Sequence, residues 1–386
     1  MNNIDQVKSY FRLFLKKMVR IALYVTDFIP AQNNKILFFA GTRGYTCSPK
    51  YICEYLNKEY PGKFQLCWIG NDKKQINDLP YLKFIKYNSL DMLYAMITAR
   101  VYVTNGTNAV CPKSKKRLIL CTWHGFPYKK MGYDTTEKFQ VIDAENSAMD
   151  ICLSASETFS RDCVKSGYHF EGKILNCGFP RNDIFFNQVQ REEAARRVRN
   201  HYGLDGLVVL FAPTYRGEYN FSKKIDTLID FERLEETLKR RFGNNVHIII
   251  RMHYYDKNQY SILSNVTDVG DWYDMQDILC ATDILITDYS SSMWDFALTE
   301  RPCFLFTPDL EQYNRTRGLY TEPQTWPGIL CKNMDELCKA ILDLDEKAYV
   351  HKINKYLKDN GSYEKGNATT ISCHEIVKFL NFNTNK

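Results

Sequence analysis

Short apolar runs alternate with helical stretches along most of the chain. The first series is KILFFA (35–40), FQLCWI (64–69), VYVT (101–104), RLILCT (117–122), ICLS (151–154) and KILNC (173–177). The second is LVVLFAP (207–213), VHIIIR (246–251), DILITD (283–288) and PCFLF (302–306), and helical stretches include 48–60, 90–99 and about 190–202. Near-continuous apolar strands separated by helices are typical of parallel sheets covered on both faces. We therefore predict an α/β fold with two Rossmann-like, doubly wound domains, over residues 31–203 and 204–386.

Composition narrows the class of partner. The chain has 386 residues, 45% apolar and 25% charged, which is globular and long enough for two domains. Its formal net charge of +6 is too small to indicate nucleic acid, but it suits an anionic ligand or an anionic membrane surface. Thirteen scattered cysteines without a C-x-x-C pair argue against a zinc site and a disulfide framework, and they fit a reducing cytosol.

The segment 1–30 is a separate unit in this interpretation. Its apolar and aromatic residues are interrupted by lysines and arginines, and its uncharged run from 21 to 26 is too short to cross a bilayer. The pattern indicates a basic amphipathic helix lying in the cytoplasmic membrane interface. A helix packed on the protein itself is the alternative.

The first candidate site follows the strand at 117–122. Ligands of open parallel sheets bind beyond the carboxyl ends of the strands. The sequence there is Trp-His-Gly-Phe-Pro (123–127). The imidazole of His124 can accept a proton from an alcohol at neutral pH, and Gly125 lets a substrate approach the backbone. The alternative is a hydrogen-bonded structural histidine beside a packed tryptophan.

Three further strand ends carry cations. Arg181 lies in GFPRND (178–183), where its guanidinium suits a phosphate or carboxylate, or forms a salt bridge with a neighbouring acid. Thr214 and Arg216 follow the strand at 207–213 and can hold a phosphate or a ribose, unless they form a plain turn with a surface arginine. Arg251-Met252-His253 ends another strand and suggests a diphosphate site, the alternative being a supporting role for the histidine.

A serine run starts the last predicted site. Asp288-Tyr-Ser-Ser-Ser is followed by a predicted helix that contains Asp295. Serines at a helix start leave backbone N–H groups for a phosphate, and Asp295 can accept a hydrogen bond from a ribose hydroxyl. Simple N-capping is the alternative, and it needs only one of the serines.

Together these runs resemble the CDP-glycerol glycerophosphotransferase family, which builds the polyol-phosphate chains of wall teichoic acid and related capsules. The runs that carry the resemblance are WHGFPYKKMGYD (123–134), GFPRND (178–183), FAPTYRG (211–217), RMH (251–253), ILITDYSSSMWDFALTERP (284–302) and DLEQYNRTRGLY (309–320) with PG (327–328). The resemblance implies a GT-B-like architecture with two domains facing a cleft, and a peripheral location on the cytoplasmic face of the cell membrane. The chain departs from the family pattern at Phe126, where a small polar residue is usual, and at GLYTEP (318–323). These departures leave the identity of the polyol and of the acceptor open.

The resemblance also assigns roles. His124 and His253 correspond to the two essential histidines. The residues assigned to the substrate are Trp123, Gly125, Phe126, Pro127, Arg181, Pro213, Thr214, Arg216, Arg251, Met252, Ser290, Ser291 and Asp295. The expected reaction moves glycerol phosphate (or ribitol phosphate) from a CDP-polyol to a hydroxyl of a polyprenyl-diphosphate-linked or polymeric acceptor, and CMP leaves.

No metal or other cofactor is expected, because cations and helix ends can neutralise the charge and no aspartate cluster is apparent. Two alternatives remain at this point. One is a GT-B glycosyltransferase that uses a sugar nucleotide, and the other is a membrane-docked scaffold with an inactive site.

Overall fold

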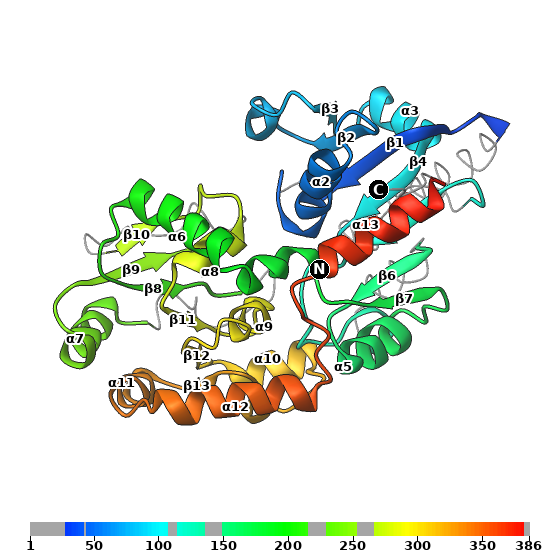
Figure 1. Cartoon of the computed structure of the whole chain (residues 1–386). Coiled ribbons are helices and arrows are strands. Elements are labelled where there is room, and N and C mark those ends of the chain that lie inside the picture. The colour runs from blue at the N-terminus through cyan, green and yellow to red at the C-terminus, as the bar shows by residue number, and fades with distance from the viewer. Residues whose placement is uncertain are drawn as a thin grey trace, which may run out of the picture.

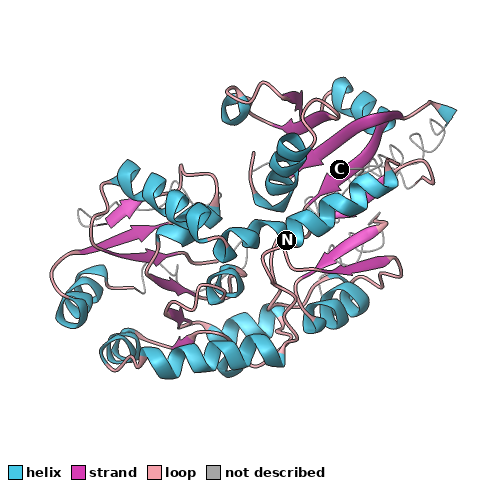
Figure 2. Ribbon diagram, viewed as in Figure 1, coloured by secondary structure: helices cyan, strands magenta, loops and turns pink. Residues whose placement is uncertain are grey.

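The computed structural model describes residues 28–41, 44–106, 114–135, 149–214, 229–252 and 266–381. Two parallel sheets, each accompanied by helices, make up the molecule (Figures 1 and 2). The first sheet contains β1 (Gln32–Phe39), β2 (Gln65–Gly70), β3 (Leu82–Lys86), β4 (Ala99–Thr104), β5 (Leu118–Cys121), β6 (Ile151–Ser154) and β7 (Lys173–Asn176). Its strand order is β3-β2-β1-β4-β5-β6-β7. The predicted α/β class with parallel sheets is confirmed.

The second sheet repeats this topology. It contains β8 (Leu207–Phe211), β9 (Val246–Ile250), β10 (Val266–Asp268), β11 (Ile284–Thr287), β12 (Cys303–Phe306) and β13 (Ile329–Cys331). The strand order is β10-β9-β8-β11-β12-β13, which is the 3-2-1-4-5-6 order of Rossmann-type sheets. The first sheet has the same order with a seventh strand, β7, added at its end. The order reverses between β1 and β4 in the first sheet and between β8 and β11 in the second. Ligands of such sheets bind at these reversal points.

Helices connect the strands and cover the sheets. The α-helices are α2 (Cys47–Glu59), α3 (Leu90–Thr98), α5 (Glu157–Phe159), α6 (Gln188–Tyr202), α7 (Phe231–Phe242), α8 (Met275–Ala281), α9 (Ser292–Ala297), α10 (Leu310–Arg317), α11 (Met334–Leu342), α12 (Glu346–Asp359) and α13 (Ala368–Phe379). The remaining helical segments, 3-10 or π in type, are η2 (Lys74–Ile76), η3 (Gly132–Asp134), η4 (Ser160–Gly167), η5 (Pro180–Phe186) and η8 (Pro323–Thr325). Of these, η4 is a π-helix that directly continues α5.

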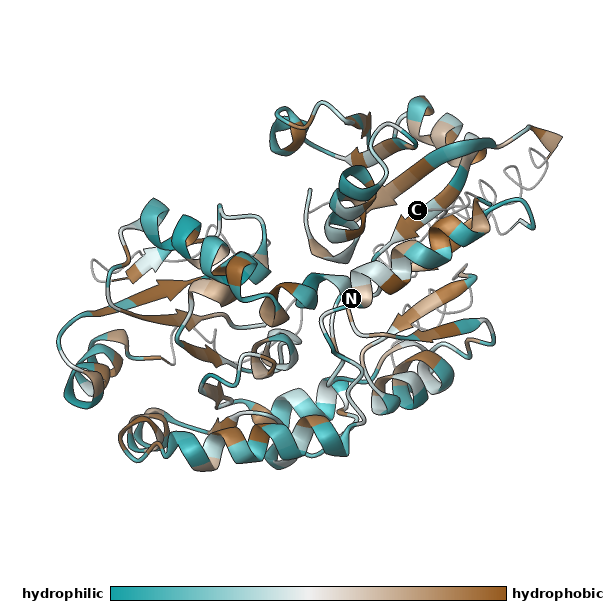
Figure 3. Ribbon diagram, in the orientation of Figure 1, coloured by the Kyte–Doolittle hydropathy of each residue, from teal (hydrophilic) through white to brown (hydrophobic). Residues whose placement is uncertain are grey.

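The strands form where apolar side chains can be buried on both faces. Every residue of β5, β6, β11 and β12 is buried, and the strands are the most hydrophobic parts of the ribbon (Figure 3). One buried cluster runs from the first sheet into the second, and it includes Trp123, Phe126 and Trp294. The two halves of the molecule therefore share apolar packing.

The chain ends back on the first sheet. Ala368, Cys373 and Ile376 of α13 are buried in one cluster with Ile52 and Leu56 of α2. In Figure 1 this last helix, drawn in red, lies beside α2 and far from α7 and α11. The predicted domain boundaries remain a prediction, but helix α13 packs with the half of the molecule that precedes residue 204.

The predicted amphipathic helix falls on residues outside the described part of the chain, apart from 28–30. None of the helices in the described ranges is long and apolar enough to cross a membrane.

Candidate active site at the junction of the two sheets

The loop after β5 presents a histidine at the carboxyl edge of the first sheet. The His124 side chain is exposed, and its Nδ1 lies 2.8 Å from the carbonyl oxygen of Asn105, which follows β4 at the reversal point. Because a carbonyl only accepts hydrogen bonds, Nδ1 carries the proton in this contact. In the neutral imidazole, Nε2 then keeps its lone pair. The Trp123 ring stacks on the imidazole, with centroids 5.3 Å apart.

Gly125 brings this loop against the second sheet. Its φ of +141° lies in the region that favours glycine. A Cβ added there would lie 2.4 Å from Ser291 Oγ and 3.0 Å from an Arg181 side-chain nitrogen. Gly125 therefore lets the residue before α9 approach this loop closely, and its role in admitting a substrate stays a prediction.

The serine run contributes the other side of that contact, from the loop between β11 and α9. Ser290 and Ser291 precede α9 and are half-buried. The Ser290 hydroxyl accepts hydrogen bonds from the backbone N–H of Ser292 at 3.3 Å and from its hydroxyl at 2.9 Å. No side-chain cap is formed by Ser291. The role of this turn in holding a phosphate stays a prediction.

Arg181 and Asp295 meet each other in the structure. An Nη2 of Arg181 donates to Asp295 Oδ2 at 2.6 Å, and Nη1 donates to the backbone oxygen of His124 at 2.7 Å. Burial opposes the Arg181 charge, but Asp295 more than offsets it and the pKa of the guanidinium is raised. Burial raises the pKa of Asp295, and Arg181 opposes that shift. This pair joins the two halves of the site. The assignment of Arg181 and Asp295 to the donor stays a prediction.

Two more residues complete this buried junction network, which we define as Arg181, Asn182, Asp295 and Glu364. The Asn182 amide donates to Asp295 Oδ1 at 3.1 Å and to Glu364 Oε1 at 2.9 Å. Glu364 also accepts from the backbone N–H of Phe179 at 3.1 Å. Burial raises the pKa of Glu364 to about 8. No motif marked Glu364, since its burial depends on the return of the chain from α12 to the first sheet.

Polar groups also meet at the reversal point of the second sheet. The backbone N–H of Thr214 donates to Asp288 Oδ1 at 2.9 Å, so the loops after β8 and β11 are tied together. An Nη2 of Arg251 donates to the carbonyl oxygen of Tyr273 at 3.1 Å. Pro213 and Met252 are buried beside these groups. Asp288 was noted only as the start of the serine run, and its position after a strand was the signal for this structural role.

A second ion pair joins α2 to the second sheet. Lys50 Nζ lies 2.7 Å from Asp274 Oδ2, which also accepts a hydrogen bond from the Tyr51 hydroxyl at 3.2 Å. Asp274 caps α8 through Gln276. No sequence pattern indicates this pair, because the partners are separated by more than two hundred positions.

Two predicted residues, His253 and Arg216, lie outside the described residues. The convergence of two imidazoles on one pyrophosphate therefore stays a prediction. Among the described residues no group of three or more histidine, cysteine, aspartate or glutamate side chains is placed to hold a metal ion.

A family model described as CDP-Glycerol:Poly(glycerophosphate) glycerophosphotransferase matches residues 21–378. The chain belongs to this family. The predicted resemblance is thus confirmed, and with it the expectation of a transferase of the CDP-glycerol type.

Relatives of this glycerophosphotransferase family member match most of its length. It is 29% identical to a teichoic acid poly(glycerol phosphate) polymerase of Bacillus spizizenii, over 97% of this chain and 99% of the relative. It is 30% identical to a polymerase of the same name from Staphylococcus epidermidis, over 85% of this chain but only 48% of that longer protein. A solved histidine variant of the wall teichoic acid polymerase TagF, soaked with CDPG, matches with a TM-score of 0.82 and 26% identity, over 98% of this chain and 99% of that one.

Phe126 and Pro127 complete the loop of this transferase. Phe126 is buried and stacks on Trp294 of α9, with centroids 4.3 Å apart and planes inclined by 6°. Pro127 is half-buried next to Tyr128, whose ring packs on Trp326. The large ring that departs from the family pattern is therefore part of the packing between the two halves, and its assignment to the substrate stays a prediction.

Proposed function

We propose that this member of the family transfers glycerol phosphate from CDP-glycerol to a hydroxyl group of a teichoic acid chain or a related capsule chain. The observation that carries the proposal is the placement of His124. Its imidazole is exposed at the carboxyl edge of the first sheet, its Nδ1 is held by the Asn105 carbonyl, and its loop abuts Ser291. A base and a predicted phosphate-binding turn then face one site from opposite sheets.

The proposed chemistry is one in-line displacement. Nε2 of His124 takes the proton of the acceptor hydroxyl, and that oxygen forms a bond to the β-phosphorus of CDP-glycerol. The bond from that phosphorus to the bridging oxygen breaks, and CMP leaves with the electron pair. Arg251, His253 and the backbone N–H groups at Ser290 and Ser291 stabilise the negative charge on the phosphoryl and leaving oxygens. This scheme uses no metal ion.

The family resemblance supports a proposal for the surroundings of the reaction. We propose a GT-B-like arrangement, in which the second sheet and its helices hold the nucleotide and the first sheet carries the acceptor. The basic segment 1–30 would dock the enzyme as a peripheral protein on the cytoplasmic face of the membrane. A polyprenyl-diphosphate-linked acceptor fits such a location. The relatives named as polymerases favour a growing chain as the acceptor.

A donor and acceptor screen tests the proposal. The full chain is incubated with CDP-glycerol, CDP-ribitol or a sugar nucleotide, together with a synthetic lipid-linked acceptor. The masses of the products are measured by mass spectrometry. We expect CMP release and a mass increase of one or more glycerol phosphate units with CDP-glycerol. Transfer with only a sugar nucleotide would establish a glycosyltransferase instead, and no turnover with any donor would favour a scaffold.

A further inference from the structure

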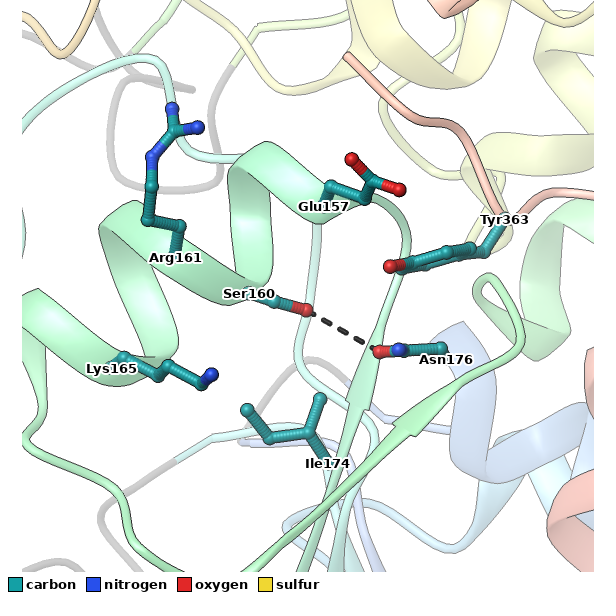
Figure 4. Close-up of a pocket in the computed structure, with 7 residues that line it drawn as sticks. All are labelled: Glu157, Ser160, Arg161, Lys165, Ile174, Asn176 and Tyr363. Atoms are coloured by element: carbon teal, nitrogen blue, oxygen red, sulfur yellow. Dashed lines mark hydrogen bonds between the residues drawn. The ribbon is translucent and has the colours of Figure 1, made fainter.

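A pocket of about 290 Å³ lies at the free edge of the first sheet, outside the junction network. Its walls come from α5 and η4, from the outermost strand β7, and from Tyr363 on the returning C-terminal segment (Figure 4). Because α5 follows the carboxyl end of β6 and Asn176 ends β7, the pocket opens at the same sheet edge as the His124 loop. The π-helical winding of η4 is a form that often accompanies functional sites.

The lining of this pocket combines two cations and one carboxylate with hydroxyl and amide groups. The Lys165 ammonium and the Tyr363 hydroxyl point toward one another across the opening (Figure 4). Ser160 Oγ donates to Ser154 Oγ at 2.7 Å and lies 3.4 Å from Asn176 Oδ1, and the Glu157 carboxylate lies above the Tyr363 ring (Figure 4). Lys165 forms no ion pair with any residue that the structure describes.

The neighbouring arginine forms an ion pair at the surface. Arg161 lines the pocket too, but its Nε and an Nη2 donate to the two carboxylate oxygens of Asp162 at 2.6 and 2.9 Å. Arg161, Lys165 and Glu157 together give the lining side chains a net charge of one positive unit, beside acceptors and donors for hydroxyl groups. A ligand with a single negative charge and several hydroxyls matches this set, and a polyol phosphodiester has that chemistry.

The pocket adjoins the predicted reaction site through aromatic packing. Phe159, the residue before Ser160, lies 5.7 Å by ring centroid from Trp123, which stacks on His124. On the other wall, Tyr363 donates its backbone N–H to the Ala155 oxygen at 2.8 Å and directly precedes Glu364 of the junction network. The pocket is therefore connected to the His124 loop by packed aromatic side chains.

We infer that this pocket is a secondary subsite for the acceptor, which holds a phosphodiester unit of a polyol-phosphate chain at a distance from the reacting end. The inference rests on the proposed function. The Lys165 ammonium pairs with the phosphodiester, and Ser160, Asn176 and Glu157 accept or donate hydrogen bonds to the polyol hydroxyls.

The test measures binding and turnover with the same full-length enzyme. Dissociation constants for synthetic oligo(glycerol phosphate) of one unit and of ten units are measured by calorimetry, for the wild type, Lys165→Ala, Lys165→Arg and Lys58→Ala. Lys58 is an exposed lysine on α2, outside the pocket, and serves as the charge-matched control. We expect Lys165→Ala to weaken binding of the ten-unit chain about fivefold and to leave one-unit binding unchanged. Lys165→Arg and Lys58→Ala should bind like the wild type.

Several outcomes would overturn the subsite. Unchanged ten-unit binding by Lys165→Ala would do so, and so would an equal loss for both lengths, which would indicate a change at the reaction site. Equal affinity for an uncharged glucan of similar length would mean that the pocket binds a neutral saccharide and not a phosphodiester. A wild type that transfers nothing from CDP-glycerol to the one-unit, ten-unit and lipid-linked acceptors would refute the proposed function, whereas the binding data would still decide on the pocket.

Discussion

Removal of the Arg181 guanidinium should destabilise the protein strongly. The substitution Arg181→Met keeps an unbranched side chain but leaves the Asp295 carboxylate, whose side chain is only 3% exposed, without its cation at 2.6 Å. Breaking one side of a buried ion pair costs about 3–5 kcal/mol in unfolding free energy, because a charge stays buried and unmatched. The substitution also removes the donor to the backbone oxygen of His124, so the rate of transfer should fall in the fraction that remains folded.

A double-mutant cycle makes this prediction sharp. Urea unfolding followed by tryptophan fluorescence would compare Arg181→Met, Asp295→Asn, the double variant, and Arg196→Met, an exposed position on α6. We expect the double variant to lose at least ~1.5 kcal/mol less unfolding free energy than the sum of the two single losses. The unfolding free energy of Arg196→Met should stay within about 0.5 kcal/mol of the wild-type value. Additive single effects, or a loss below about 1 kcal/mol for Arg181→Met, would refute the coupled pair.

Three further variants test other parts of the site. Gly125→Ala should lower turnover at least about tenfold, because its Cβ would overlap Ser291; wild-type kinetics would show that the loop need not touch α9. Phe126→Ala should cost about 3–5 kcal/mol in chemical unfolding, since its stacking on Trp294 is lost, and a change below about 1 kcal/mol would contradict that packing. Glu364→Gln tests the raised Glu364 pKa of about 8. The folded protein keeps the Glu364 proton up to about pH 8, whereas the unfolded chain releases it near its ordinary pKa of 4.5. The unfolding free energy of the wild type should therefore fall relative to that of the variant between these two pH values, by up to ~1.4 kcal/mol per pH unit, and then level off. Parallel stability curves would contradict the Glu364 assignment.

The central strands of both sheets were predictable, and some edge strands were not. The centres of runs such as RLILCT and DILITD are apolar because neighbours cover both faces and both sides of the strand. Strands β3, β10 and β13 were missed, and each lies at an edge of its sheet. In β3, Leu82–Lys86, polar residues alternate with apolar ones, so the run lacks the continuous apolar pattern.

The site divides in the same way. The loop after β5 was placed at the correct edge, because the position of a residue after a parallel strand is a local property. The partners of Arg181 were not predictable, since Asp295 is 114 positions away and only tertiary packing brings the two together. Glu364 lies even farther along the chain and has no local pattern, because its environment is formed by Asn182 and the backbone of Phe179.

The central claim is that His124 takes the proton of the acceptor hydroxyl. Its most direct test is the steady-state transfer of glycerol phosphate from CDP-glycerol by His124→Ala, with His351→Ala on the exposed surface of α12 as the matched control. We predict that kcat falls by about 10²–10⁴-fold in His124→Ala while its Kd for CDP-glycerol and the kinetics of the control stay at wild-type values. A wild-type kcat in His124→Ala would contradict the account.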